Sequence, residues 1–392
     1  MNILVIGNGF DLAHGLPTKY YDFIQFIKFI KVIYIKEAYE RNSIIKDKIR
    51  ISEESLDINK NILEKLLDES IYKTNHFKEF ILCINNNLWI EYFKNKVKIQ
   101  NTWVDFEMSI KEVIELLDII KRKHKEEISI ENFDISNLRE IMNIFLNYDK
   151  PIYLYKNTDF GQFKKDLNNK FIENLELDLK KLIRALEIYI SLFIENIDLS
   201  LYKGKVENID KVISFNYSNT FERLYGLHNI ECDYIHGKAN LEREINKNNM
   251  VLGIDEYLDD EIKDKYLDFI FFKKYFQRIY KRTGCNYKYW LEEIVESNEE
   301  SNIYFYGHSL SRADNDILRD LILCENIKVH IFYHSDDAYR SQITNLVDVI
   351  GQDKLIEKVY GSNATIIFES TEDKEQLEII GGKSNNRLAT VI

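Results

Sequence analysis

Proline and glycine are scarce in this 392-residue chain, which holds only 2 prolines and 14 glycines. These residues are the strongest breakers of regular structure, so their shortage favours long helices. Hydrophobic residues make up 45% of the chain and charged residues 30%, a balance that can build a sizeable buried core. We therefore expect a globular protein of one large domain or two ordinary ones.

Cysteine is also rare. The four cysteines stand far apart in the sequence, so no Cys-x-x-Cys zinc pattern is present: Cys83, Cys232, Cys285 and Cys324. We interpret them as reduced core residues, which is typical of cytoplasmic proteins, and we predict no metal site.

The chain has no excess of basic charge and no long apolar run. Its formal net charge is −12, and no Lys/Arg cluster stands free of neighbouring acids, so nucleic acid is a poor candidate partner. Within the apolar residues 20–35, polar side chains recur too often for a membrane span. The chain opens directly into a strand-like run, with no basic leader. We expect a cytoplasmic protein that does not enter a membrane.

The pattern of apolar residues changes twice along the chain. Residues 2–6 (NILVI) form a run of strand type, and a helix is expected to start near Thr18. Up to residue 204, apolar residues then recur at three- and four-residue spacing, which predicts helices. Later strand-like runs alternate with helical stretches; they cover residues 211–215, 232–235, 249–252, 302–306, 327–333 and 364–368.

Strands that alternate with helices predict an α/β fold with a parallel sheet covered on both faces. The simplest topology joins the first strand to the later ones, in one domain of residues 1–19 plus 205–370. Residues 20–204 then form a large all-helical insertion, and residues 371–392 form a C-terminal tail.

The first candidate site follows the first strand, in the sequence GNGFDLAHGLPT. Gly7 and Gly9 would let the backbone turn sharply and approach a phosphate, and a following helix would offer N–H groups. The usual dinucleotide fingerprint needs a third glycine where this chain has Leu12, and the next glycine is Gly15. The pattern therefore allows either a phosphate-binding turn or a tight turn without a ligand.

Two further motifs place polar residues at the ends of predicted strands. Asn216, in FNYSNT, could orient a water or hold a hydroxyl, although Asn is also common in turns and caps. His236, in YIHG, would be exposed to the cleft and suits a general base, or it is a hydrogen-bonded structural histidine.

The remaining motifs are YGHSLSRADND, at residues 306–316, and WVDFE, at residues 103–107. The first combines glycine and hydroxyls ahead of a helix, which suits a phosphate or ribose, although Ser311 or Asp314 could simply cap that helix. In the second, Trp103 and Glu107 would share one helical face, with Trp103 in the core.

Taken in the order in which they occur along the chain, these five segments resemble the AbiH-type bacterial abortive-infection proteins. More distantly, they are similar to the sirtuin-like domains of anti-phage NAD hydrolases. The resemblance covers the first 25 residues and roughly residues 205–350, with WVDFE between them. It implies a sirtuin-like, Rossmann-type core, a role in defence against phage, and NAD as the substrate.

The resemblance also implies roles for individual residues. Asn216 would position the attacking water or the nicotinamide ribose, and His236 would be the catalytic histidine on a ribose hydroxyl. The residues implied to hold the nucleotide are Gly7, Asn8, Gly9, Phe10, Gly15, Gly307, His308 and Ser309. The chain lacks the Cys₄ zinc module of sirtuin deacylases, which argues against lysine deacylation.

Three functions stay open on these observations. The leading one is hydrolysis of NAD at the nicotinamide–ribose bond, with Asp11 stabilising the positive charge that builds on the ribose. The second is a nucleotide-binding sensor without chemistry. The third is a metal-dependent nuclease or phosphohydrolase with Asp11, His14, Glu107 and His236 as ligands. A phage-derived trigger acting on the helical insertion and a homo-oligomer are further expectations.

Overall fold

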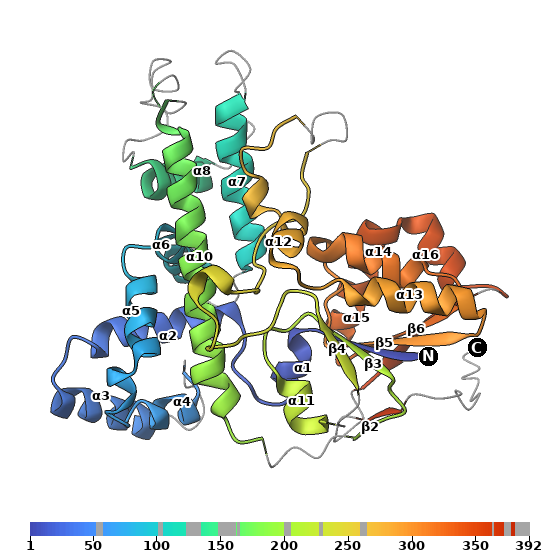
Figure 1. The fold of residues 1–392 in the computed structure, drawn as a ribbon, viewed down its shortest axis with the longest axis horizontal. Coiled ribbons are helices and arrows are strands. Elements are labelled where there is room, and N and C mark those ends of the chain that lie inside the picture. Colours follow the sequence, from blue (N-terminus) through green and yellow to red (C-terminus); the bar gives the residue numbers. More distant parts are fainter. Residues whose placement is uncertain are drawn as a thin grey trace. The chain divides into compact units, whose positions relative to one another are not determined.

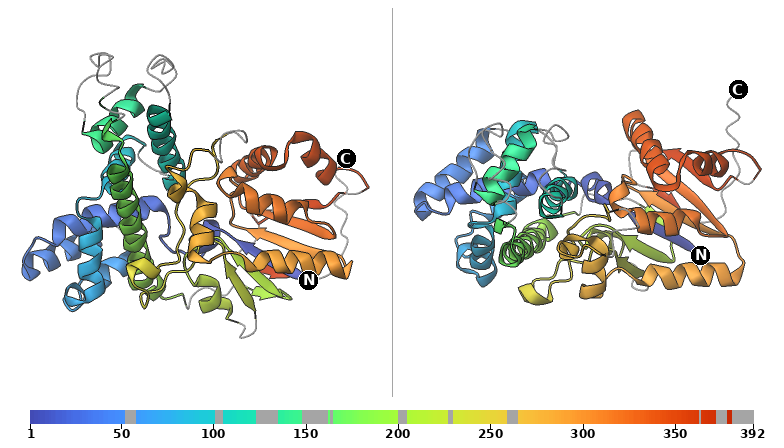
Figure 2. Two further views of the ribbon diagram at one scale, coloured as in Figure 1. Left: turned by 45° about the horizontal axis from the view of Figure 1, so that its top comes forward. Right: turned by 90° about the horizontal axis from the view of Figure 1, so that it is seen from above.

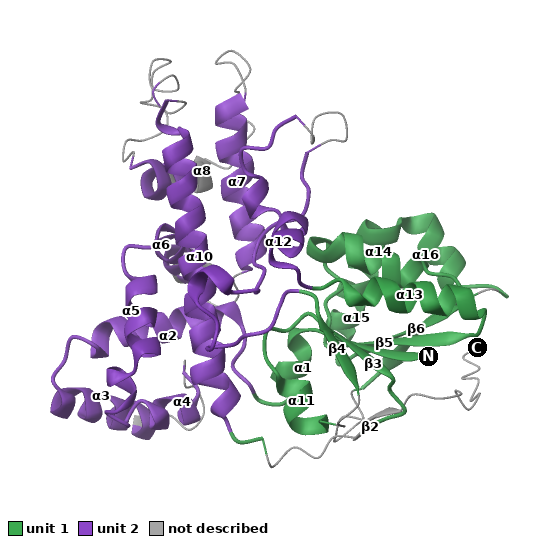
Figure 3. Cartoon of the chain, viewed as in Figure 1, with its two compact units in different colours: residues 1–15, 198–235, 284–392 green, residues 16–197, 236–283 purple. Residues whose placement is uncertain are grey.

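The computed structural model describes residues 1–51, 58–100, 105–122, 135–147, 162, 165–199, 205–226, 230–258, 265–362, 364–371 and 378–380. The chain divides into two compact units (Figure 3). The sheet unit comprises residues 1–15, 198–235 and 284–392, and the helical unit comprises residues 16–197 and 236–283. The helical unit therefore includes residues 236–283, which we expected in the sheet domain.

A six-stranded parallel sheet forms the centre of the sheet unit (Figure 1). Its strands, in spatial order, are β4 (Glu231–Tyr234), β3 (Lys211–Ser214), β1 (Asn2–Ile6), β5 (Ser301–Tyr306), β6 (Ile327–Tyr333) and β7 (Ile366–Ser370). The chain runs outward from β1 through β3 to β4, and then returns to the other side of β1 for β5, β6 and β7. The order of strands therefore reverses between β1 and β5, and the α/β fold with a parallel sheet is confirmed.

Both faces of this sheet are buried, which explains why β1 reads as an unbroken apolar run. Ile3 and Val5 belong to one core cluster, while Leu4 and Ile6 belong to another on the opposite face. The first cluster is covered by α13 (Asn286–Ser297), α14 (Asn315–Leu323), α15 (Asp336–Ile350) and α16 (Gln352–Val359). The second is covered by α1 (Asn8–Ala13) and α11 (Thr220–Tyr225).

Several sequence predictions differ from the structure in detail. Residues 249–252 form no strand, because their amides bond to side chains and a loop carbonyl: Met250 N–H donates to Asn248, Val251 to the His236 carbonyl and Leu252 to Gln277. The strand predicted at 364–368 runs instead from Ile366 to Ser370.

The predicted tail contributes a strand, since β8 (Glu378–Ile380) pairs in parallel with β2 (Lys205–Glu207). The helix expected near Thr18 begins at Tyr20. It is capped by Lys19, whose N–H donates to the carboxylate of Asp22.

The helical unit is built around α10 (Asn169–Leu192), which packs against α5 (Asn75–Ile84) and α6 (Leu88–Gln100) (Figure 2). Asn168 caps α10 by accepting from the Phe171 N–H. The other α-helices that the structure describes in this unit are α2 (Tyr20–Ile33), α3 (Ala38–Ile51), α4 (Lys60–Lys65), α7 (Phe106–Arg122), α8 (Ile135–Leu146) and α12 (Lys274–Lys281).

Aromatic side chains fill much of the core of the helical unit. Phe106, at the start of α7, is stacked between Tyr20 and Phe93, with ring centroids 4.1 and 3.9 Å away. Near the end of α10, Phe26 packs against Tyr189 and Phe193. Within the described part of the chain, no helix is both long and apolar enough to cross a membrane.

Candidate functional site at the carboxyl edge of the sheet

A cavity of about 570 Å³ lies at the carboxyl ends of β1, β5, β6 and β7. It brings together four residues predicted to hold a nucleotide, namely Gly9, Gly307, His308 and Ser309. The other lining residues are Leu12, Ala13, Tyr306, Phe332, Tyr333, His334, Ala338, Ser341, Gln342 and Thr371. Parallel strands present their carboxyl ends at one edge, and this explains why residues distant in sequence meet there.

The lining of this cavity contains aromatic rings, histidines and hydroxyls, but no Lys, Arg, Asp or Glu. Such a surface suits the uncharged ring portions of a ligand better than its phosphates. Gln342 joins two parts of the wall, because its side-chain amide donates to the carbonyls of His308 and Phe332, at 3.3 and 3.2 Å.

The loop after β5 holds His308 in one orientation. Gly307 and Leu310 both have left-handed backbones, with φ of +65° and +58°. The Leu310 N–H donates to His308 Nδ1 at 2.9 Å, so Nδ1 is an acceptor and a ring proton must be on Nε2. His308 Nε2 lies 3.8 Å from a carboxylate oxygen of Asp314. The loop thus sets both the position and the tautomer of this imidazole.

The glycines of the first turn allow two backbones to approach each other. The Gly9 N–H donates to the Gly307 carbonyl at 2.8 Å. A Cβ on Gly9 would lie 2.7 Å from the Cα of Gly307, and a Cβ on Gly7 would lie 2.8 Å from the Gly307 oxygen. These distances are too short for any side chain. The Gly9 amide is therefore engaged within the protein, and the glycine pattern is explained by close packing of the two turns.

A buried polar cluster joins the first turn to the turn after β3. The Asn216 side-chain amide donates to the Gly7 carbonyl at 3.0 Å. Ser218 donates to Asp11 at 2.6 Å and lies 2.9 Å from the hydroxyl of Thr220. The sequence placed Asn216 and Asp11 in a catalytic site, and the structure brings both into this cluster.

Asp11 is only 1% exposed, and burial raises its pKa to about 6 despite the hydrogen bond from Ser218. The second carboxylate oxygen of Asp11 is buried and accepts no hydrogen bond from the described residues. A buried carboxylate with a raised pKa is more common at functional sites, where altered acidity serves chemistry.

Other residues of the first motif have structural contacts. Phe10 is fully buried in the core, and Asn8 is exposed. Gly15, with φ of +70°, follows the end of α1 and donates to the Leu12 carbonyl. His14 contacts the Phe10 carbonyl at 2.7 Å and the Tyr225 hydroxyl at 2.8 Å, and burial lowers its pKa.

Two candidate residues lie in the helical unit. His236 was expected to be exposed to a cleft, but it is only 4% exposed. It sits in a turn, and its backbone carbonyl accepts from the Val251 N–H. Glu107 forms a 2.8 Å ion pair with the buried Lys274. Trp103 lies outside the described residues. Among the residues that the structure describes, no three His, Cys, Asp or Glu side chains gather as a metal site.

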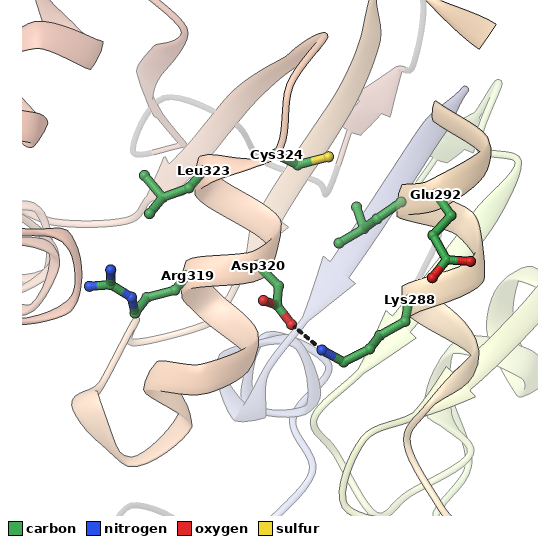
Figure 4. A pocket seen from close by; sticks show the side chains of 7 residues that line it. Lys288, Glu292, Arg319, Asp320, Leu323 and Cys324 are labelled. Atoms are coloured by element: carbon green, nitrogen blue, oxygen red, sulfur yellow. Dashed lines mark hydrogen bonds and ion pairs between the residues drawn. The ribbon is translucent and has the colours of Figure 1, made fainter. Parts of the chain in front are cut away.

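A second hollow of about 490 Å³ lies on the sheet unit, between α13 and α14 (Figure 4). Lys288 and Asp320 face each other across it in a 2.8 Å ion pair, and Tyr287 also donates to Asp320. Arg319 points away from this pair and donates to the Val349 carbonyl. Because these polar groups satisfy one another, the hollow is a weaker candidate than the cavity at the sheet edge.

Sequence reasoning missed the wall that β6 and β7 contribute. Phe332, Tyr333, His334 and Thr371 follow or end these strands, yet no local motif marks them. The alternation of strands and helices could have indicated this wall. It predicts a parallel sheet, in which every strand has its carboxyl end at the same edge as β1 and β5.

The fold and the site define an α/β protein with a parallel sheet and a ligand-sized cavity at the carboxyl ends of its strands. The family model described as "Bacteriophage abortive infection AbiH" matches residues 3–333. The chain belongs to the AbiH family of bacteriophage abortive-infection proteins. Among curated proteins, none matches it.

Proposed function

We propose that the sheet unit binds NAD in the cavity at the carboxyl ends of β1, β5, β6 and β7. We propose further that the chain acts in phage abortive infection by hydrolysing NAD at the nicotinamide–ribose bond. The position of the cavity carries this proposal. Numbered along the chain, the six strands of the sheet have the spatial order 3-2-1-4-5-6, that of Rossmann-type sheets. Such sheets bind dinucleotides where the strand order reverses, and the cavity extends from that point, at Gly9 and Gly307.

The cavity also suits parts of this ligand chemically. Its volume of about 570 Å³ lies within the usual range for small-molecule sites. Tyr306, Phe332 and Tyr333 offer ring surfaces, while Ser309 and Thr371 offer hydroxyls that can hydrogen bond to a ribose.

The proposed reaction adds water to NAD and releases nicotinamide, ADP-ribose and a proton. Positive charge builds on the ribose as the glycosidic bond breaks, and a carboxylate stabilises that charge. With a pKa of about 6, Asp11 is largely ionised at neutral pH. It is buried beside Ser218 and is not among the residues that line the cavity, so its role in stabilising that charge stays a prediction from the sequence. Asn216, through its bond to Gly7, holds the neighbouring turn. His236 as a general base stays a prediction from the sequence.

The test measures nicotinamide released from NAD by the purified full-length chain. Asp11→Asn keeps the shape of the side chain and removes its charge, so release should fall at least about a hundredfold. Asp353→Asn, an exposed substitution with the same change of charge, should leave release unchanged. If phage protection persists while cellular NAD stays intact, the hydrolysis proposal is wrong.

A binding-only sensor is the second candidate, and one observation favours it. The Gly9 amide and the Asn216 amide, both expected to face the ligand, are already bonded within the protein. A sensor should bind NAD without cleaving it, and Asp11→Asn should then leave protection against phage intact. A substitution that fills the cavity should abolish protection under either function.

A further inference from the structure

The helical unit contains a cavity of its own, of about 470 Å³, where positive charge gathers. It is lined by Lys180, Ile183, Ile245, Asn246, Lys247, Asn248, Tyr280, Lys281 and Arg282. Four of these nine residues are cations and none is acidic, although the whole chain carries a formal net charge of −12. The lining of this cavity is therefore positive, opposite in sign to the net charge of the chain.

Three separate segments bring the cations together. Lys180 projects from α10, Lys247 from the short helical turn Ile245–Lys247, and Lys281 and Arg282 from the end of α12. Cations at the end of one helix have a structural explanation, because they offset the helix dipole. That explanation covers Lys281 and Arg282, but it does not cover the cations that converge from the other two segments.

Lys180 pairs with Glu176 and Lys247 pairs with Glu244, but neither acid lines the cavity. Lys281 differs from both. Its amine donates to the Met250 carbonyl, which is a neutral partner. Burial lowers the pKa of Lys281 to about 8; Glu187 opposes this shift, and Lys180 adds to it. Glu187 cannot neutralise the cavity, because its carboxylate is fully buried and bonded to Arg184 and Asn248.

We propose that this cavity binds a small molecule that carries phosphate groups. Lys and Arg donors from different directions are the usual partners of phosphate oxygens. The volume is that of a small-molecule site, and Ile183, Ile245 and the 66% exposed Tyr280 provide apolar surface for the rest of the ligand. This site does not depend on NAD hydrolysis in the sheet unit.

The first experiment titrates the purified full-length chain with pyrophosphate and measures the heat of binding. Lys180→Gln and Lys181→Gln form a matched pair: the residues are neighbours on α10 and each has an acidic partner, but only Lys180 lines the cavity. Lys180→Gln should weaken binding about tenfold, because a charged hydrogen bond is lost, while Lys181→Gln should change it less than about twofold.

The second experiment uses sulfate, which keeps the same charge between pH 6 and 9, and follows binding against pH. An amine with a pKa of about 8 loses its charge as pH rises through that value, so sulfate binding should weaken there. Lys281→Met keeps most of the length of the unbranched side chain, removes its charge, and should remove this step. The parent chain and the Lys281→Met variant share the other charged groups around the amine, which are Lys180, Glu187 and Arg282.

Three results would overturn the proposal. The first is that Lys181→Gln weakens pyrophosphate binding as much as Lys180→Gln does, which is the behaviour of an unspecific basic surface. The chain could fail to bind pyrophosphate at millimolar concentration. Citrate, a carboxylate anion of similar charge, could bind much more tightly than pyrophosphate, which would show that phosphate is not the recognised group. Retained unfolding midpoints in all three variants ensure that any loss of binding reflects the site.

Discussion

The backbone N–H of Gly9 donates to the carbonyl of Gly307 across 2.8 Å, although the two residues are almost three hundred positions apart. This bond joins the turn after β1 to the turn after β5, at the point where the order of strands reverses. The candidate cavity begins at these same two residues. A structural contact therefore fixes one end of the site.

Gly9→Ala should destabilise the protein by about 1–3 kcal/mol, because the new methyl group would overlap the backbone of Gly307. The free energy of unfolding, from urea titrations, checks this. Asn8→Ala, in the same turn but exposed, should change that free energy by less than about 0.5 kcal/mol. Equal stability of Gly9→Ala and the parent would mean that the turns are not in such close contact.

Asp11→Asn should stabilise the protein at neutral pH. The pKa of Asp11 is about 6 in the folded protein against an ordinary value of 3.8, so between these values the folded state holds a proton that the unfolded chain has lost. The contribution of Asp11 to stability therefore falls as pH rises from about 4 to about 6, by about 3 kcal/mol in all. The Asn variant lacks this fall.

The measurement for Asp11 is the difference in unfolding free energy between parent and variant across that pH range. Ser218→Ala should raise the pKa of Asp11 further, since the hydrogen bond from Ser218 lowers it, and should move the fall to higher pH. Asp353→Asn should give a curve parallel to that of the parent. A parallel curve for Asp11→Asn would contradict the raised pKa.

If the sheet unit binds NAD as proposed, Ala338→Trp should abolish that binding, because the indole would occupy the cavity that Ala338 lines. Val347→Trp, on the same helix but outside the cavity lining, is the matched control and should bind as the parent does. Equilibrium binding of NAD to the full-length chain measures both. Unchanged affinity in Ala338→Trp would place the NAD site elsewhere.

Arg184→Met should destabilise the helical unit by about 3–5 kcal/mol, because Arg184 is the cation that pairs with the buried carboxylate of Glu187, at 2.6 Å. Adding Glu187→Gln should recover part of this loss, since the uncompensated charge is then gone. Urea unfolding followed by circular dichroism, which reports on helices, provides the measurement. Lys181→Met, on the same helix and half-exposed, should cost far less.

The AbiH resemblance came from short motifs, and the match over residues 3–333 confirms the family. The local pattern also predicted the α/β class and located β1 and β6 at their observed bounds. It failed at residues 249–252, where buried apolar residues suggested a strand. There, side chains such as Gln277 supply the hydrogen bonds that a neighbouring strand would otherwise supply.

The sequence by itself predicted the α/β class and most strands of the six-stranded sheet, because apolar spacing and the scarcity of breakers are local properties. Only the tertiary structure decided what the glycines and the candidate side chains do. Gly9 lies against Gly307, Asp11 lies beside Ser218, and four cations meet in the helical unit. Such contacts join residues far apart in the chain, and they arise from the order of strands and the packing of helices, which no local pattern encodes.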